Sequence, residues 1–170
     1  MDTQLKIAFG GRMGTGKDTA VSYLLKNFGG EQISFATPIY DILHYAQKRC
    51  GFPPEKDRKF LQYIGADWAR IKDDNVWIRL ALDAVPQKGN VFISDLRFMN
   101  EFRALKNSGW TCVLLKRAEL DESRVGNGSH LHVSETALDC IPDDEWSAVI
   151  HNNDTVEQFY EQIRLLVQPL

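Results

Sequence analysis

The chain has 170 residues, of which 44% are hydrophobic and 25% charged, a composition typical of one soluble globular domain and not of a disordered or fibrous protein. The net charge is −3, and Lys and Arg form no long block, so we expect no nucleic-acid partner bound through the overall charge. No stretch approaches the ~18 apolar residues of a membrane span. Because no such run is present, we expect no membrane contact. The three cysteines are far apart, which indicates a reducing cytoplasm.

The first predicted elements are a strand and a helix joined by a glycine-rich turn. Residues 5–9 form a short apolar run that ends at Gly10 and Gly11. Apolar residues then recur at helical spacing over residues 20–28, before two further glycines stop the helix.

Two further elements are predicted next. Residues 32–35 have the composition of a second short strand. Thr37 and Pro38 fit the N-cap and first position of a helix that ends before a Gly-Phe-Pro-Pro break.

A charged helix is predicted over residues 55–67. Asp73 or Asp74 then fits the N-cap of another helix. Its apolar stripe comprises Val76, Trp77, Leu80, Ala81 and Val85.

The second half of the chain alternates strands and helices. Strands are predicted over residues 91–95, 110–115 and 147–150, and helices over 98–107 and 156–167. The strands are apolar throughout, which favours a parallel sheet covered on both faces. The sequence therefore predicts an α/β fold of three layers with about five parallel strands.

The turn after the first strand has the pattern Gly-x-x-x-x-Gly-Lys, which is typical of loops that bind nucleotide triphosphates. Glycines let successive backbone N–H groups point at phosphate oxygens, the next helix presents its positive N-terminus, and Lys17 can reach the terminal phosphates. An ordinary tight turn is the alternative. The predicted ATP-binding residues are Gly11, Arg12, Gly14, Thr15, Gly16, Lys17, Asp18 and Thr19.

Asp18 departs from the common pattern, in which a Ser or Thr hydroxyl at this position binds Mg²⁺. Either Asp18 contacts Mg²⁺, or Thr19 takes part of that role, or Asp18 is only a first-turn helix carboxylate.

Asp95 and Arg97 follow the predicted strand 91–95, at the sheet edge where doubly wound proteins bind ligands. Asp95 can hold Mg²⁺ through water or accept a hydrogen bond from a sugar hydroxyl, and Arg97 offers a fork to a phosphate. A solvated turn with a helix N-cap is the alternative.

Phosphoryl transfer needs several cations, and these can come from scattered arginines. The least apolar stretch, residues 116–132, contains Gly126 and Gly128 and is predicted to be a mobile lid that carries Arg117 and Arg124. His132 is predicted to be a lid or hinge residue. Arg70 and Arg79 are further candidates. The aromatic candidates for base stacking, each of which can instead be a core residue, are Phe35, Tyr40, Tyr63, Trp68 and Trp77.

Several segments together resemble the deoxynucleoside monophosphate kinases of bacteriophages, a branch of the P-loop kinases. They occur in order over nearly the whole chain. The segments are Gly16-Lys17-Asp18-Thr19, Phe35-Ala36-Thr37-Pro38, residues 61–77, Asp95-x-Arg97-Phe98-x-Asn100-Glu101, His132-x-Ser134-Glu135 and Asn152-Asn153-Asp154.

The resemblance implies a single P-loop kinase domain over residues 1–170, with a helical monophosphate-binding region at about 36–72 and a lid at about 116–132. It implies ATP and Mg²⁺ as cofactors, a possible homodimer, and work in the host cytoplasm if the protein is phage-encoded. Asp95 and Arg97 would face the acceptor, whose predicted pocket also includes Phe35, Pro38, Tyr40, Arg70 and Trp77. The segment from Asn152 to Asp154, with Asn153 as the predicted ATP-binding residue, would lie near the donor adenine. Arg117 and Arg124 would be lid-side cations.

The predicted reaction is transfer of a phosphoryl group from ATP to a (deoxy)nucleoside monophosphate, with Lys17, Arg97 and Arg117 as the catalytic cations. Two alternatives stay open: a P-loop kinase of another small metabolite, and a nucleotide-binding regulatory module without transfer activity. A GTPase switch is disfavoured because no Asn/Thr-Lys-x-Asp motif stands near the last strand.

Overall fold

The computed structural model describes residues 4–118 and 136–167. Contacts within the chain divide it into two compact units. The first unit comprises Met1–Gln32 and Pro86–Leu170, and the second unit comprises Ile33–Val85. In the described residues, none of the helices combines the length and the apolar character that a membrane crossing requires.

The first unit is built on a five-stranded sheet in the order β2-β3-β1-β4-β5. Its strands are β1 (Lys6–Gly10), β2 (Glu31–Ile33), β3 (Val91–Leu96), β4 (Thr111–Lys116) and β5 (Ala148–His151). Strand β1 lies between β3 and β4, parallel to both, with Ile7 opposite Phe92 and Thr111. Strand β5 continues the parallel sheet beside β4. The α/β fold predicted from the sequence is confirmed.

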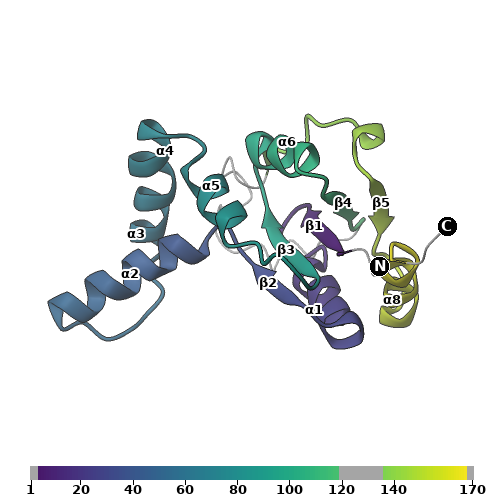
Figure 1. Cartoon of the computed structure of the whole chain (residues 1–170), viewed down its shortest axis with the longest axis horizontal. Coiled ribbons are helices and arrows are strands. Elements are labelled where there is room, and N and C mark those ends of the chain that lie inside the picture. Colours follow the sequence, from purple (N-terminus) through teal and green to yellow (C-terminus); the bar gives the residue numbers. More distant parts are fainter. Residues whose placement is uncertain (1–3, 119–135, 168–170) are drawn as a thin grey trace. The chain divides into compact units, whose positions relative to one another are not determined.

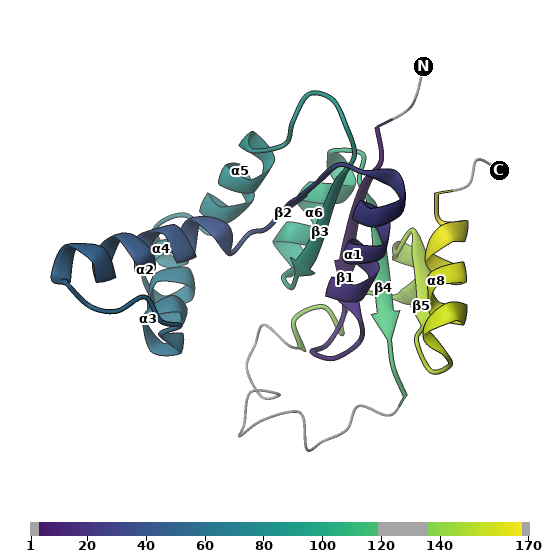
Figure 2. The same cartoon turned by 90° about the horizontal axis from the view of Figure 1, so that it is seen from below.

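Helices cover both faces of this sheet (Figures 1 and 2). Helix α1 (Lys17–Phe28) and helix α8 (Val156–Leu165) lie on one face, and α6 (Met99–Asn107) lies on the other. The core under α1 and α8 contains Phe9, Leu24 and Phe159, all at most 2% exposed. Because the strands are buried on both faces, they carry continuous apolar runs instead of an alternating pattern.

The second unit consists of helices. They are α2 (Thr37–Cys50), α3 (Arg58–Gln62), the π-helix η1 (Tyr63–Trp68), α4 (Ala69–Lys72) and α5 (Val76–Asp83). The buried Trp77 of α5 donates its indole N–H to the Gly65 carbonyl over 2.8 Å. A Cβ at Gly65 would lie 3.0 Å from Ile39, so a glycine lets α2 approach the π-helix closely.

Four sequence-based details of the second unit are wrong. Thr37 is the first residue of α2 and not its N-cap, which is Ala36. The charged helix begins at Arg58, because the Asp57 carboxylate accepts the Phe60 N–H and caps it there. It then runs through the π-helix to Lys72.

The other two errors in this unit concern the N-cap and the core of α5, and a fifth error concerns β2 of the sheet. The N-cap of α5 is Asn75, and Leu80 is 38% exposed whereas Ile78 is buried. Strand β2 ends at Ile33 instead of Phe35, because the Ser34 hydroxyl accepts the Ala36 N–H and turns the chain.

Candidate phosphate-binding site

The loop between β1 and α1 holds its shape through glycines with positive φ. Gly11 has φ +129°, Gly14 +82° and Gly16 +104°, values that L side chains rarely adopt. A Cβ on Gly11 would lie 2.3 Å from the Leu115 carbonyl oxygen, so the loop passes directly beside the end of β4. The predicted strand, glycine loop and helix are therefore present in the order that a phosphate cradle requires.

Lys17 begins α1 and turns back over the loop. Its side chain is buried, and its ammonium group donates to the Gly11 and Arg12 carbonyl oxygens over 2.7 and 2.8 Å. The Thr15 hydroxyl donates to the same Arg12 carbonyl over 2.9 Å. These bonds hold a cationic group within the loop, beside the N-terminus of α1, where anions are favoured.

The turn after β5 contacts the phosphate loop through Asn152. Asn152 donates its side-chain N–H to the Thr15 carbonyl over 3.0 Å, and a Cβ on Gly16 would meet that amide nitrogen at 2.7 Å. Its neighbour Asn153 accepts the Ala118 N–H over 2.7 Å, at the exit of β4. The structure thus places the Asn153 side chain on the backbone after β4; its predicted contact with adenine stays a prediction.

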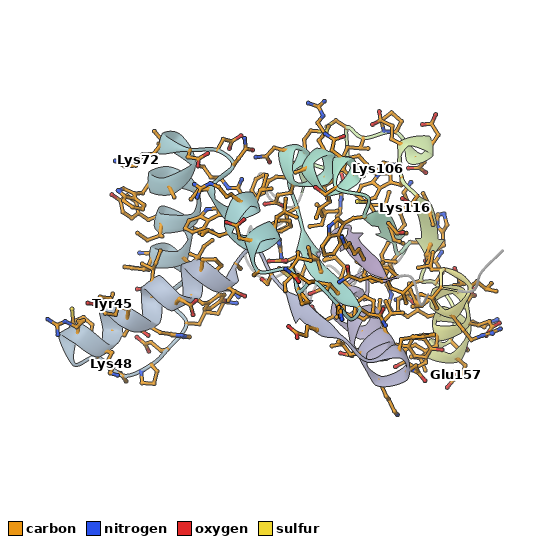
Figure 3. The ribbon with its side chains drawn as sticks, viewed as in Figure 1. Tyr45, Lys48, Lys72, Lys106, Lys116 and Glu157 are labelled. Atoms are coloured by element: carbon orange, nitrogen blue, oxygen red, sulfur yellow. The ribbon has the colours of Figure 1, made fainter. Side chains whose placement is uncertain are left out.

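The segment before β5 also contacts the loop. The Trp146 ring fills the space beside Gly10, where a Cβ would lie 2.6 Å from it. Asp139 forms a 2.6 Å ion pair with Arg12, and this pair is largely exposed. Two lysines hold the same segment, since Lys116 pairs with Asp143 and Lys106 donates to the Glu145 carbonyl (Figure 3).

The residues predicted to hold Mg²⁺ belong to α1 and β3. Asp18 and Thr19 are exposed in the first turn of α1. Asp95 is half-buried in β3, next to Leu96, which pairs with Gly10 of β1. No group of three or more His, Cys, Asp or Glu side chains in residues 4–118 and 136–167 can hold a metal by itself.

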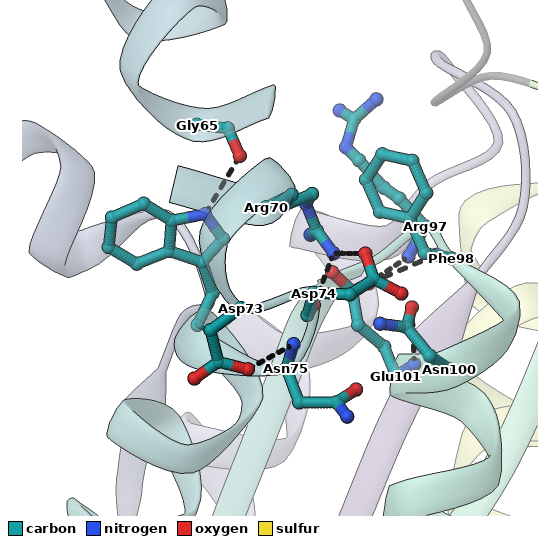
Figure 4. A network of polar contacts seen from close by, with 10 residues as sticks. Gly65, Arg70, Asp73, Asp74, Asn75, Arg97, Phe98, Asn100 and Glu101 are labelled. Carbon is teal, nitrogen blue, oxygen red and sulfur yellow. Dashed lines mark hydrogen bonds and ion pairs between the residues drawn. The ribbon is translucent and has the colours of Figure 1, made fainter. Parts of the chain in front are cut away.

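Arg97 is held by a buried acid. The Glu101 side chain is 1% exposed, and one of its oxygens accepts the backbone N–H groups of Arg97 and Phe98 over 2.9 and 3.0 Å (Figure 4). This bond fixes the backbone where β3 passes into α6. The side chain of Arg97 is half-buried. The position of Arg97 is therefore set by the fold and not by a flexible loop.

Several predicted acceptor residues belong to the second unit. Phe35 is buried, whereas Pro38 and Tyr40 are half-buried on α2. Arg70 donates to the Asp74 backbone over 3.3 Å. Trp77 is 2% exposed and uses its N–H on Gly65, so it is a core residue of this unit, and we leave it out of the proposed site.

The Asp73 carboxylate accepts the Asn75 N–H over 3.0 Å (Figure 4). The hydrogen bond from Arg79 lowers the pKa of the Asp73 carboxyl below its usual value. Arg79, a further predicted cation, is thus used in an exposed ion pair on α5.

Of the predicted lid residues, Arg117 directly follows β4 and is exposed. Arg124 and His132 lie outside the described residues, as does most of the predicted lid.

Comparisons with known proteins place the chain among viral relatives. Over 165 residues it is 38% identical to Uncharacterized protein ORF77 of Ictalurid herpesvirus 1 (strain Auburn), covering 92% of this chain and 68% of that protein. The chain belongs to the ORF77 family. The chain is also 29% identical over 184 residues to a protein of Acanthamoeba polyphaga mimivirus named "Putative deoxynucleotide monophosphate kinase". This match covers 90% of the chain and 91% of the mimivirus protein. No protein-family model matches the chain.

The fold of this ORF77-family chain is that of the P-loop kinases. A sugar kinase from Janibacter sp. HTCC2649, solved without ligand, superimposes with a TM-score of 0.55 at 17% identity, over 94% of this chain and 92% of that chain. At this identity the likeness shows the fold alone.

Two contacts of the loop were missed by the sequence analysis. The resemblance implies only that Asn152 lies near the donor adenine, whereas its bond to Thr15 joins residues 137 positions apart. Asp139, the partner of Arg12, carries no sequence signal because it is one of many acidic residues on an exposed turn.

Proposed function

We propose that this protein is an ATP-dependent kinase that phosphorylates a (deoxy)nucleoside monophosphate to the diphosphate by in-line transfer. The observation that carries the proposal is the glycine-lined loop between β1 and α1, with Lys17 buried inside it. Such a loop offers backbone N–H groups, a helix N-terminus and a cation to one anionic group.

The residues divide the task as phosphoryl transfer requires. Lys17 and the loop amides bind the β- and γ-phosphates of ATP, and Arg97 with Arg117 offsets the charge of the transferring group. Asp18, Thr19 and Asp95 are the residues suited to hold Mg²⁺, which supplies further charge neutralisation when bound with ATP. No covalent intermediate with the protein is needed.

The acceptor class is supported by two observations. The mimivirus relative, similar over nearly its whole length, carries the name of a deoxynucleotide monophosphate kinase. In this chain, Asp95 and Arg97 flank Leu96, which pairs with the last residue of β1, so both lie beside the phosphate loop. A carboxylate and a guanidinium at this position suit a sugar hydroxyl and a phosphate of the acceptor.

A sugar or another small metabolite is the second candidate acceptor, because the half-buried Asp95 at the end of β3 suits a sugar hydroxyl of either kind of acceptor. The two candidates differ in the acceptor, because a nucleoside monophosphate carries a phosphate that a cation can bind and an unmodified sugar does not.

The decisive experiment incubates the protein with ATP, Mg²⁺ and each common nucleoside monophosphate, ribo and deoxy, and separately with a panel of sugars. We expect one or a few monophosphates to yield diphosphates. Phosphorylated sugars and no diphosphate would support the second candidate. Slow ATP hydrolysis that no acceptor stimulates would overturn both and favour a regulatory module.

Lys17→Ala tests the loop as the site of transfer. We expect turnover to fall by about 100-fold or more while the fold is kept, because the lost cation acts on the transition-state charge. Lys26→Ala, an exposed lysine in the last turn of the same helix, is the control and should retain full activity. Near-normal transfer by Lys17→Ala would mean that this loop is not the active site. Gel filtration with and without nucleotide tests the expected homodimer.

A further inference from the structure

Asn152 is fixed to the sheet on its backbone side. Its N–H donates to the Lys116 carbonyl over 2.8 Å, one residue beyond the pairing of Lys116 with His151 at the end of β4 and β5. The residue therefore continues a parallel ladder and does not belong to a free loop. A side chain on such a rigid element can hold a neighbouring backbone group at a defined position.

Its side chain binds one particular peptide group of the phosphate loop. The Nδ2 atom donates to the Thr15 carbonyl over 3.0 Å. Because the partner is a carbonyl oxygen, only the amide NH₂ can make this bond. The Thr15–Gly16 peptide is trans and planar, so the Gly16 N–H points away from the Thr15 carbonyl. By fixing the carbonyl, Asn152 also fixes the direction of the Gly16 N–H.

The space around Gly16 is closed on the same side. A Cβ on this residue would lie 2.7 Å from Asn152 Nδ2 and 3.3 Å from the Phe159 ring of α8. The glycine is thus needed for two reasons: its φ of +104° and its close packing against Asn152 and Phe159. With these contacts on one side, the Gly16 N–H is directed to the opposite side, where the helix N-terminus opens.

We propose that Asn152 is a positioning residue of the phosphate cradle, which holds the Thr15–Gly16 peptide so that the Gly16 N–H faces the bound phosphates. This role rests on the proposed use of the loop for ATP, and it concerns the phosphates and not the base. Asn153, the next residue, has the complementary chemistry, because its side-chain oxygen accepts the Ala118 N–H.

Replacing Asn by Asp separates these two roles, since the carboxylate keeps an acceptor and loses the donor. Calorimetric titration with ATP and with inorganic tripolyphosphate, both with Mg²⁺, measures the effect. For Asn152→Asp and Asn152→Ala we expect the affinity for both ligands to fall by about tenfold, as for a lost bond that leaves a carbonyl without its donor. The fold-change in affinity should be the same for ATP and for tripolyphosphate, because the lost hydrogen bond does not involve the base.

Two controls test whether charge alone explains the loss. Asn153→Asp adds the same charge one residue further along and keeps its bond to Ala118. Its loss of affinity for tripolyphosphate, which has no base for Asn153 to contact, should therefore be clearly smaller. Asn27→Asp removes a bond of the same kind, from Nδ2 to the Tyr23 carbonyl over 2.8 Å, on the exposed far end of α1. This variant should bind as the unchanged protein does.

Four results would overturn the proposal. They are unchanged binding in Asn152→Ala, a loss for ATP without a loss for tripolyphosphate, an equal loss in Asn153→Asp, and failure of both Asn152 variants to fold, judged by circular dichroism. The second result would assign Asn152 to the base. Because no acceptor is present, the titration stands even if no monophosphate proves to be a substrate. Conversely, a confirmed kinase in which Asn152→Ala binds normally would refute only this inference.

Discussion

The two units of the molecule distribute their apolar side chains differently. Of the large side chains that are fully buried, only Leu43 comes from the second unit, Ile33–Val85. In the described residues, seven of the eleven exposed large hydrophobic side chains belong to that unit, among them Tyr45, Phe52 and Ile71. Figure 3 shows Tyr45 on α2 with its side chain pointing outward. The first unit thus has the larger core for its phosphate loop.

This difference suggests a division of tasks. A phosphate cradle needs backbone groups held within tenths of an ångström, which a packed parallel sheet provides. A unit with few buried contacts and a π-helix opens more easily, and such regions often adapt to ligands. We therefore expect the first unit to set the binding of phosphate and the second to be the more readily opened part of the protein.

The largest expected contrast is in thiol reactivity. Cys112 lies in β4 and is fully buried, whereas Cys50 at the end of α2 and Cys140 are exposed. With iodoacetamide and mass spectrometry, we expect Cys112 to react about a thousandfold or more slowly than Cys50, because it must wait for the central sheet to open. Comparable rates would refute a rigid first unit.

Burial raises the pKa of Cys112 to about 12, so the folded thiol stays protonated at pH 9. The unfolded thiol, with its usual pKa of about 8.5, then releases its proton before the folded one. Stability should therefore decrease as the pH rises from about 9 towards 12.

The next contrast is between Gly11, at the start of the phosphate loop, and Gly29, the C-cap of α1. Gly11→Ala places a Cβ 2.3 Å from the Leu115 carbonyl at a φ of +129°, so the loop must move. We expect ATP affinity to fall about 100-fold, as measured by calorimetry. Gly29→Ala, at φ +64° and ψ −171° with no atom within 4 Å, should lose about 1–3 kcal/mol of stability and bind ATP normally. Equal losses of affinity would show that the clash with β4 is unimportant.

The smallest contrast lies within the second unit. Trp77→Phe removes the hydrogen bond to Gly65, and we expect amide exchange over α3 to α5 to accelerate about tenfold, since a buried carbonyl loses its donor. Trp68 is 44% exposed, so Trp68→Phe should change exchange far less. Protection in the β-strands should be the same in both variants. If Trp77→Phe accelerates exchange there too, the two units unfold together.

The sheet and the phosphate loop were predictable because they depend on local patterns. Apolar runs indicated β1, β3, β4 and β5 to within a few residues, and the glycine and lysine spacing located the loop. Strand β2, with the sequence Glu-Gln-Ile, has no such run, and its predicted bounds were wrong. The π-helix was not predictable, since residues 63–68 have no composition that separates it from an α-helix. The apolar stripe predicted that Leu80 is a core residue, but such a stripe does not show whether another part of the chain covers each of its residues. Leu80 is 38% exposed.

The candidate site was predictable only in part, for a related reason. Lys17 and Asp95 follow directly from the loop pattern and the strand end. The bonds from Asn152 to Thr15 and from Asp139 to Arg12 join distant parts of the chain, and no spacing rule predicts them. Glu101 belonged to a recognised motif, but its role as a buried acceptor for the Arg97 and Phe98 N–H groups required the structure.

The strand order has a consequence for synthesis of the protein on the ribosome. Strand β1 is the first to be made and lies at the centre of the sheet, yet Ile7 must wait for Phe92 and then Thr111 before both its edges are paired. Contacts between such distant residues form slowly, and an unpaired apolar strand is open to aggregation while it waits. The nascent chain therefore exposes the strand that leads into its phosphate loop until Thr111 and the rest of β4 have been translated.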